Sequence, residues 1–197
     1  MKESSKQFQA AIAAFDALNE QDPNKETVLG ELVPKEVLYA QRMSKSLLAF
    51  LPTASETLQL AARCQHLCRW EIPRSDYPTG RKGYHLWRTK LKELHAEKAG
   101  VVLEKVGYDQ ELINRVQFLV LKKQLKKDEE TQALEDVICL VFLEFYFEPF
   151  AAKHTEEKVI DILRKTWRKM SKEGQAAALK LPLSADAITI VKKALAV

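Results

Sequence analysis

Long apolar runs, a secretion signal and familiar catalytic motifs are what this 197-residue chain lacks. No stretch approaches the roughly 20 consecutive apolar residues that a membrane span requires. The N-terminus, MKESSKQFQ, has no apolar core of the kind found in a secretory signal. Cysteine is scarce, and three residues, an odd number, do not form a disulfide framework. We therefore expect a cytoplasmic protein in a reducing compartment, without membrane contact.

Motifs of nucleotide and acyl-transfer enzymes are also missing, since the chain has no Walker motif, no GxSxG and no GxGxxG. Two segments, RMSKS (42–46) and KMSKE (169–173), mimic the KMSKS loop of class I aminoacyl-tRNA synthetases. That loop acts in an α/β nucleotide-binding fold with a partner HIGH motif, and this chain has neither strand patterns nor HIGH. We interpret both segments as chance matches and expect no aminoacyl-tRNA synthetase activity.

Apolar residues recur at helical spacing in nearly every segment, and no run shows sustained strand-like alternation. The pattern predicts an all-α fold, a compact helical bundle of about seven to nine helices in a single domain over residues 1–197. The expected helices span about 5–19, 34–51, 55–70, 81–106, 109–123, 129–147, 155–170 and 184–195. Gly107 is suited to end the long helix 81–106 in a left-handed cap. The helix 129–147 contains the nearly all-apolar VICLVFL and is expected to be central.

Basic and aromatic residues concentrate in residues 63–95, which hold five of the nine arginines, two of the three tryptophans and three of the four histidines. From 63 to 92, eight lysines and arginines face two acids, a local net charge of +6 in a chain with a total of +4. Guanidinium groups fork onto phosphate oxygens, and aromatic rings stack on bases. This composition predicts a cleft for a phosphorylated, stackable ligand. The predicted ligand-binding residues are Arg63, Arg69, Trp70, Arg74, Tyr77, Arg81, Tyr84, Trp87 and Arg88.

Helical spacing suggests how these groups could converge. On the long helix, a stripe of residues three or four apart runs from Arg81 to His95, and on the preceding helix Arg63, His66 and Trp70 share a face. Because an irregular loop joins the two helices, His66 and His95 are expected to face one cleft. The alternative is that the tryptophans belong to the core, the arginines form surface pairs, and His66 is a satisfied core histidine.

Carboxylates flank the apolar helix at Glu135, Asp136 and Glu144. Such groups can be metal ligands or general bases, and a neighbouring like charge raises the pKa of one member of a pair. Asp136 and Glu144 are therefore candidate catalytic residues. The alternative is that they are helix-end groups that face solvent or pair with arginine.

Four stretches carry a family resemblance: QHLCRWEIPRSDYPTGRKGYHLWR, HAEKAGVVLEKVGYD, LEDVICLVFLE and DILRKTWRKMS. Spread over about 30–172, they resemble an uncharacterised family known as a domain of unknown function, some of whose members carry a glutamyl-tRNA synthetase label.

A more distant similarity is to the HD superfamily of all-helical, metal-dependent phosphohydrolases. It rests on LAARCQHLCRW, HAEKAGVVLEKVGYDQELINRVQFLV and LEDVICLVFLE. This resemblance implies an HD-domain-like fold and places His66, His95 and Asp136 where ligands of a divalent transition metal would be. Tyr39 stands in the place of the usual first histidine, and Leu67 replaces the aspartate of the HD pair. The implied fold does not depend on these two positions, whereas the metal-dependent mechanism does.

The sequence favours a phosphohydrolase-like enzyme acting on a phosphate ester of a nucleotide, a phosphorylated nucleoside or an RNA end. Its candidate catalytic residues are His66, His95, Asp136 and Glu144, with the imidazoles as acid, base or metal ligand. The alternative is a non-catalytic nucleotide- or RNA-binding protein on a degenerate HD scaffold. The sequence identifies neither the substrate nor the oligomeric state.

Overall fold

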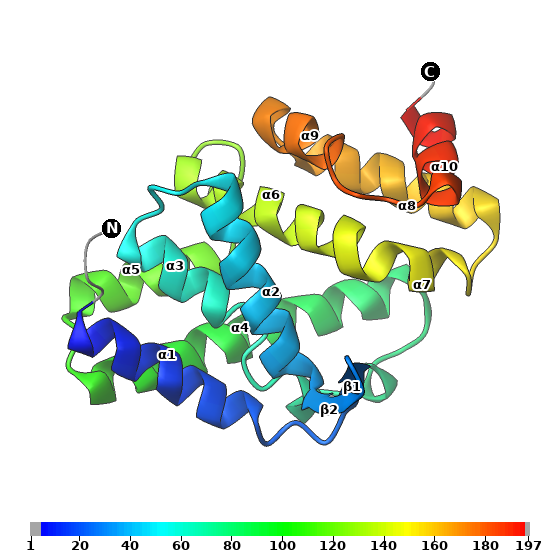
Figure 1. Cartoon of the computed structure of the whole chain (residues 1–197). Coiled ribbons are helices and arrows are strands. Elements are labelled where there is room, and N and C mark those ends of the chain that lie inside the picture. Colours follow the sequence, from blue (N-terminus) through cyan, green and yellow to red (C-terminus); the bar gives the residue numbers. More distant parts are fainter. Residues whose placement is uncertain (1–4, 196–197) are drawn as a thin grey trace.

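The computed structural model describes residues 5–195, and the all-α prediction is confirmed (Figure 1). The helices are α1 (Lys6–Asn19), α2 (Lys35–Phe50), α3 (Glu56–Arg63), α4 (Gly80–Val106), α5 (Gln110–Val120), α6 (Glu129–Val141), α7 (Phe147–Ala151), α8 (Glu156–Lys169), α9 (Lys172–Ala178) and α10 (Ala185–Leu195). Two 3-10 turns, η1 (Arg69–Glu71) and η2 (Arg74–Asp76), occupy the irregular loop before α4, and a π-helical segment, η3 (Phe142–Tyr146), joins α6 to α7. No helix in this part of the chain is long and apolar enough to cross a membrane.

Local capping explains why several helix ends fall where the sequence placed them. The side chains of Ser5 and Asp109 each accept a hydrogen bond from the backbone N–H three residues later, which satisfies a donor that has no partner inside the helix. Gly107 ends α4 with a φ of 90°, a left-handed conformation that glycine adopts without a Cβ clash. The first helix and the long helix therefore begin and end within one residue of their predicted bounds.

Helix α6 separates two apolar cores, which confirms its predicted central position. Leu134 and Val137 face a core built with α1–α5, whereas Leu140 faces a second core built with α7–α10. In Figure 1, α6 crosses the middle of the molecule with α1–α5 on one side and α8–α10 on the other. A helix that is apolar on every side fits this position because both of its faces are removed from water.

The helix predicted over 55–70 is the main error in the fold. Helix α3 ends at Arg63, a turn follows, and Cys68 adopts a φ of 55° before η1. His66 and Trp70 therefore do not extend a helical face that begins at Arg63. The backbone N–H of Cys68 donates to the Asn19 side chain, a contact made at the end of α1 and invisible to local periodicity.

A β-hairpin and two short helices were not predicted. Strands β1 (Lys25–Val28) and β2 (Glu31–Pro34) form an antiparallel hairpin in which Val28 pairs with Glu31. Leu29 and Gly30 form its two-residue turn. Both have positive φ, which a type I′ hairpin turn requires. The sequence did not indicate this turn, because Leu29 occupies the first turn position, where asparagine or aspartate is usual. The unpredicted helices are α7, which begins where the predicted helix 129–147 ends, and α9.

Candidate functional site

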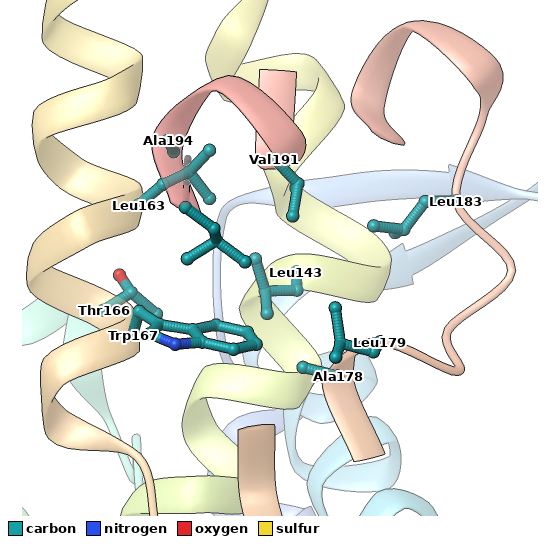
Figure 2. A pocket seen from close by; sticks show the side chains of 10 residues that line it. Leu143, Leu163, Thr166, Trp167, Ala178, Leu179, Leu183, Val191 and Ala194 are labelled. Atoms are coloured by element: carbon teal, nitrogen blue, oxygen red, sulfur yellow. The ribbon is translucent and has the colours of Figure 1, made fainter. Parts of the chain in front are cut away.

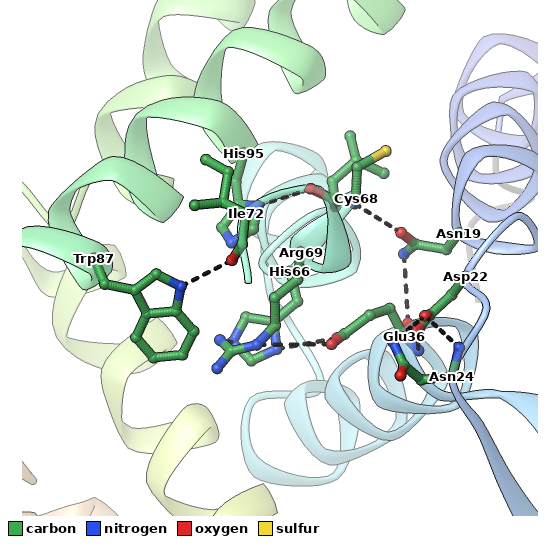
Figure 3. A network of polar contacts seen from close by, with 11 residues as sticks. Asn19, Asp22, Asn24, Glu36, His66, Cys68, Arg69, Ile72, Trp87 and His95 are labelled. Carbon is green, nitrogen blue, oxygen red and sulfur yellow. Dashed lines mark hydrogen bonds and ion pairs between the residues drawn. The ribbon is translucent and has the colours of Figure 1, made fainter. Parts of the chain in front are cut away.

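His66 and His95 lie together beneath the irregular loop, with ring centroids 5.8 Å apart, as expected for a shared site. His66 comes from the turn after α3, and His95 comes from the middle of α4. Figure 3 shows both imidazoles inside a network that connects α1, α2 and α4. We call the surrounding group the His–Arg cluster. It comprises Glu36, Tyr39, His66, Arg69, Trp87, Arg88, His95, Lys122 and Glu135.

Hydrogen bonds determine the tautomer of each imidazole. Nδ1 of His95 lies 2.7 Å from the Leu67 carbonyl oxygen, so Nδ1 carries the proton and donates it. Nε2 of His95 is then a lone-pair acceptor, and it is buried without a hydrogen-bond partner among residues 5–195. Burial lowers the pKa of His95 to about 3, so this ring is neutral near pH 7.

His66 has charged partners on both nitrogens. Nε2 lies 3.3 Å from Arg69, which can only donate, and Nδ1 therefore carries the proton toward a Glu36 oxygen 3.2 Å away. Burial, followed by the charge of Arg69, holds the pKa of His66 well below its usual value. The result is a neutral imidazole oriented by a carboxylate.

Glu36 is a buried carboxylate at the start of α2. Its backbone N–H donates to Asp22 at 3.1 Å, and its backbone carbonyl accepts a hydrogen bond from the Asn19 side chain (Figure 3). Burial raises the pKa of the Glu36 side chain to about 7, with Arg69 opposing this effect. Glu36 therefore changes charge near neutral pH, directly beside His66.

Arg69 is held between a carboxylate and an aromatic ring. Its Nε lies 3.7 Å from a Glu36 oxygen, and its guanidinium carbon lies 4.7 Å from the centre of the Trp87 ring. Trp87 is itself buried and donates from Nε1 to the Ile72 carbonyl at 2.9 Å. The face of the Trp87 ring therefore makes a cation–π contact with Arg69, and its Nε1–H connects the loop at Ile72 to α4.

Arg88 and Lys122 add positive charge on the other side of the histidines. Arg88 is half-buried and makes no hydrogen bond or ion pair with any residue that the structure describes, although its charge acts on His66, His95 and Glu135. Lys122 forms an ion pair with the buried carboxylate of Glu135, and Lys169 lies 3.7 Å from the same carboxylate. Despite its burial, these charges lower the pKa of Glu135, while burial lowers the pKa of Lys122 against the attraction of Glu135.

The charges of this region do not balance. Two carboxylates, Glu36 and Glu135, face four cations, while both imidazoles are neutral. The cations are Arg69, Arg88, Lys122 and Lys169. The arrangement therefore carries two positive charges in excess when Glu36 is ionised and three when Glu36 is neutral, and a partly buried excess of this kind calls for an anion.

Several of the predicted ligand-binding residues have structural contacts instead. Arg63 forms a two-pronged pair with Asp16 on α1, and Trp70 packs against the first core. Arg74 donates to the carbonyls of Tyr77 and Pro78, both at 2.8 Å, and so closes its own loop. The alternative expected paired arginines and core tryptophans, and these are the contacts that Arg63 and Trp70 make, although the Arg63–Asp16 pair is partly buried and not on the surface.

The remaining predicted residues divide between the cluster and the surface. Arg81 and Tyr84 are exposed, and Arg81 contacts His85 one helical turn further on. Tyr77 is half-buried in the loop. From the predicted set of nine, Arg69, Trp87 and Arg88 lie in the His–Arg cluster.

Asp136 does not join the histidines. Its carboxylate accepts hydrogen bonds from the backbone N–H of Ser171 at 2.8 Å, from the hydroxyl of Ser171 at 2.6 Å, and from the Gln132 side chain at 3.0 Å. Gly174 passes so close that a Cβ there would lie 2.6 Å from the carboxylate. Asp136 thus anchors the start of α9 to α6.

The predicted metal set of His66, His95 and Asp136 is therefore not assembled. Within residues 5–195, no three histidine, cysteine, aspartate or glutamate side chains are grouped so that they could hold a metal ion. The adjacent Glu135 faces the cluster instead, because successive helical residues point about 100° apart. The sequence indicated Glu135 as a carboxylate beside the apolar helix, but the metal-ligand and catalytic role was predicted for Asp136. Glu36 and Lys122 were not predicted, because neither belongs to a recognisable motif.

Glu144, the fourth predicted catalytic residue, lies elsewhere. It is exposed on η3 and lines a hollow of about 470 Å³ between α2, η3 and α9, together with Arg42 and Lys180. Arg42 donates to the Tyr146 hydroxyl at 2.8 Å, and the Tyr146 ring lies 6.1 Å from that of Tyr39. The hollow is therefore next to the cluster but separated from it by these tyrosines.

A second cavity lies in the C-terminal core between α8, α9 and α10 (Figure 2). Leu143, Leu163 and Trp167 are among the side chains that line it. Its volume of about 20 Å³ is room for about one water molecule, whereas ligand pockets occupy roughly 300–1,000 Å³. This cavity is a packing gap, not a ligand site.

The chain belongs to a protein family described as a domain of unknown function (DUF4202), whose model matches residues 9–191. The match covers every element that builds the His–Arg cluster. Neither the curated proteins nor the solved structures contain a match to this chain.

Proposed function

We propose that the protein binds a phosphorylated ligand, a nucleotide or a phosphorylated nucleoside or RNA end, at the His–Arg cluster and hydrolyses its phosphate ester. The observation that carries this proposal is the uncompensated positive charge around two neutral imidazoles. Arg88 is central to it, because its guanidinium has five N–H donors and none of them donates to a residue that the structure describes. A phosphate group supplies both the charge and the paired oxygens that such a fork binds.

The Glu36–His66 pair supplies the proton-transfer chemistry of the proposal. Because Nδ1 of His66 donates toward Glu36, Nε2 is the proton-accepting atom. A bound phosphate would raise the pKa of His66 by its negative charge and attract Arg69, which frees Nε2 to accept a proton from an attacking water. The water oxygen would bond to phosphorus as the ester P–O bond breaks, and the departing oxygen would take a proton from solvent. His66 is thus the proposed general base, and Glu36 orients it.

The distant resemblance to HD phosphohydrolases, which rests on the sequence alone, agrees with part of the proposal. Three positions of that resemblance meet, since the Tyr39 ring stacks on His66, and His66 adjoins His95. These residues do not form the metal site that the resemblance implies. The Asp136 carboxylate accepts hydrogen bonds from Ser171 instead, and Tyr39 stands where the resemblance has a histidine ligand. No step of the proposed chemistry therefore passes through a metal.

A second candidate is a binding protein without turnover. It is favoured by the contact from Arg69 to Nε2 of His66, which occupies the lone pair that a general base would use. In this function the same cations would hold the phosphate, and the histidines would complete the shape of the site.

The ligand is first sought by a thermal-shift screen over nucleotides, cyclic nucleotides, dinucleotides and tRNA, since a ligand that binds the folded state raises its melting temperature. For the best ligand, Arg88→Ala should weaken binding tenfold or more, because a charge-assisted hydrogen bond contributes about 1.5–3 kcal/mol. Arg81→Ala, on the same helix but exposed, is the matched control and should bind like the unaltered protein. Equal affinity of Arg88→Ala and the unaltered protein would refute the proposed site.

Turnover is measured separately as release of inorganic phosphate from the ligand that binds. The hydrolase proposal predicts release that His66→Gln reduces at least a hundredfold while affinity changes little. Binding that depends on Arg88 without any phosphate release would establish the second candidate.

A further inference from the structure

The hollow between α2, η3 and α9 has the size and the lining of a small-molecule site. Its volume of about 470 Å³ falls within the roughly 300–1,000 Å³ of ligand pockets. Its lining is mostly apolar, and Phe50, Leu140 and Phe145 reach it from three different elements. None of the described residues that line it belongs to the His–Arg cluster, so the proposed function leaves this hollow without a role.

Arg42, which lines the hollow from α2, is held in one orientation by three residues. Its Nη1 donates to the Tyr146 hydroxyl at 2.8 Å and to a Glu26 oxygen at 3.3 Å. Its guanidinium carbon lies 4.6 Å from the centre of the Phe145 ring and 5.1 Å from that of Tyr146. Because the side chain is fixed by these contacts and only 18% exposed, it loses little conformational freedom when a ligand binds.

The other edge of this guanidinium has no partner. Nε and Nη2 of Arg42 donate to no residue that the structure describes. Two guanidinium nitrogens on one edge can make parallel hydrogen bonds to the two oxygens of a carboxylate. Ser46 lies one helical turn further along α2 and also lines the hollow, and its hydroxyl has no acceptor among the described residues. The α2 side therefore presents fixed donors for one carboxylate.

The charges that line the hollow favour a ligand with one negative group over a ligand with two. Two lysines, two glutamates and Arg42 contribute these charges, and Arg42 is already paired with Glu26. The positive charge is therefore balanced. A second negative group on the ligand would meet charges of like sign at Glu144 on η3 and Glu173 on α9.

The backbone of η3 also supports a ligand site here. This segment is π-helical, a rare conformation that occurs frequently at functional sites. Pro149 follows it and cannot donate the helical hydrogen bond to the Phe145 carbonyl, so the sequence favours an interruption of the α-helix at this point. Glu144 and Phe145, which line the hollow, both belong to the interrupted segment.

We propose that the hollow is a second ligand site, which binds a small molecule with one carboxylate and an apolar body. The carboxylate lies against the unpartnered edge of Arg42 and the hydroxyl of Ser46. The apolar body covers Phe50, Leu140 and Phe145. Both parts of the ligand are needed, because an ion pair at a solvent-exposed site contributes little by itself and burial of apolar surface supplies the rest.

The test is a titration of the ¹⁵N-labelled full chain with three small ligands. Hydrocinnamate has the carboxylate and the apolar body, hydrocinnamamide lacks the charge, and acetate lacks the apolar body. The backbone amide resonances of Phe145, Ala176 and Ala177 should shift and saturate with hydrocinnamate, and the affinities for the other two should be at least tenfold lower. Equal affinity for hydrocinnamamide, or no saturable shift with hydrocinnamate, would refute the site.

Substitution of Arg42 tests the carboxylate contact. Arg42→Ala should weaken hydrocinnamate binding tenfold or more, because the paired hydrogen bonds are lost. Arg63→Ala is the matched control, since Arg63 is also a partly buried arginine in an ion pair but does not line the hollow. Equal weakening by both substitutions would assign the effect to lost stability and contradict a role for Arg42.

A second variant tests the hollow while Arg42 stays in place. Ala49 is exposed and lines the hollow, so Ala49→Trp should fill the space and abolish the saturable shifts. Ala10→Trp, at an exposed position on α1, should leave them unchanged. Hydrocinnamate binding by Ala49→Trp as tight as that of the unaltered protein would overturn the site, even if Arg42→Ala fails to fold.

Two further measurements define the ligand and separate this site from the proposed function. Phenyl phosphate, a dianion, should bind the hollow more weakly than hydrocinnamate, and equal or tighter binding there would contradict a site for one carboxylate. Arg88→Ala should leave the affinity for hydrocinnamate unchanged. Loss of that affinity in Arg88→Ala would place the carboxylate in the His–Arg cluster and show that the hollow is not an independent site.

Discussion

The imidazole of His66 lies flat on the phenol ring of Tyr39, with ring centroids 3.9 Å apart and planes 11° from parallel. Tyr39 is buried on α2, so it covers one face of the imidazole while Glu36 and Arg69 hold the two nitrogens. The orientation of His66 is thus determined by three residues from two separate segments. This relationship leads to the first prediction.

Tyr39→Ala should destabilise the protein by about 3–5 kcal/mol, the usual cost of truncating a buried ring to alanine. Tyr39→Phe keeps the ring and should change the free energy of unfolding by less than about 1 kcal/mol, since a volume-conserving change is well tolerated. Urea denaturation measures both. If Tyr39→Ala unfolds at the same urea concentration as Tyr39→Phe, the stacking does not contribute to stability.

Asp136→Ala should destabilise the protein by about 1–3 kcal/mol, because it leaves the backbone N–H and hydroxyl of Ser171 without their acceptor. The loss should be local as well, with faster hydrogen exchange at the amides of α9. Asp161→Ala is the control, since Asp161 makes an exposed pair with Lys165 and such pairs contribute little. Unchanged exchange in α9 of Asp136→Ala would show that this carboxylate is not its anchor.

His95→Asn should make the protein less sensitive to acid. The pKa of His95 in the folded state, about 3, lies below the ordinary value of 6.5. The associated stability is therefore fully present above pH 6.5 and is lost as pH falls toward 3, with each unit between the two pKa values worth about 1.4 kcal/mol. Asparagine can still donate to the Leu67 carbonyl but does not titrate.

The measurement is the free energy of unfolding of both proteins at several pH values across that window. The slope with pH should be smaller in His95→Asn, and the exposed substitution His154→Asn should leave it unchanged. An identical slope in all three proteins would mean that His95 is not kept neutral by burial.

Glu36→Gln should abolish a pH dependence of anion binding near neutrality. With its pKa raised to about 7, Glu36 is neutral at lower pH and negative at higher pH, so sulfate should bind the His–Arg cluster more weakly as pH rises through 7. Sulfate is the suitable probe because it remains a dianion throughout this range. Calorimetric titration of the unaltered protein and of Glu36→Gln compares the two, and an equal decline in both would assign the effect to another group.

Local signals in the sequence predicted most of the helices. The caps at Ser5, Asp109 and Gly107 act within one helical turn, so a reader of the chain can recognise them without knowing the fold. The end of α3 could not be predicted in this way. LAARCQHLCRW keeps a helical pattern, but Asn19 binds the backbone N–H of Cys68, which lies 49 residues away in sequence.

The candidate site also combines features that the local sequence indicates with features that depend on long-range contacts. The concentration of arginine and aromatic residues pointed to the segment that contributes Arg69, Trp87 and Arg88 to the His–Arg cluster, and it brought His66 and His95 into consideration together. It could not separate Arg69 and Arg88 from Arg63 and Arg74, because each guanidinium binds wherever an acceptor is nearest in space. For Arg63 that acceptor is Asp16, 47 residues away in sequence.

The sequence by itself determined the helical class, the central apolar helix and the segment that carries the excess of positive charge, because periodicity, capping and net charge are properties of neighbouring residues. Only the tertiary structure decided which charges remain without partners. Glu36 and Glu135 meet the histidines and lysines across separate helices, and Asp136 turns away to Ser171. An ion pair depends on distances of a few ångströms between side chains, and those distances are set by how the helices pack.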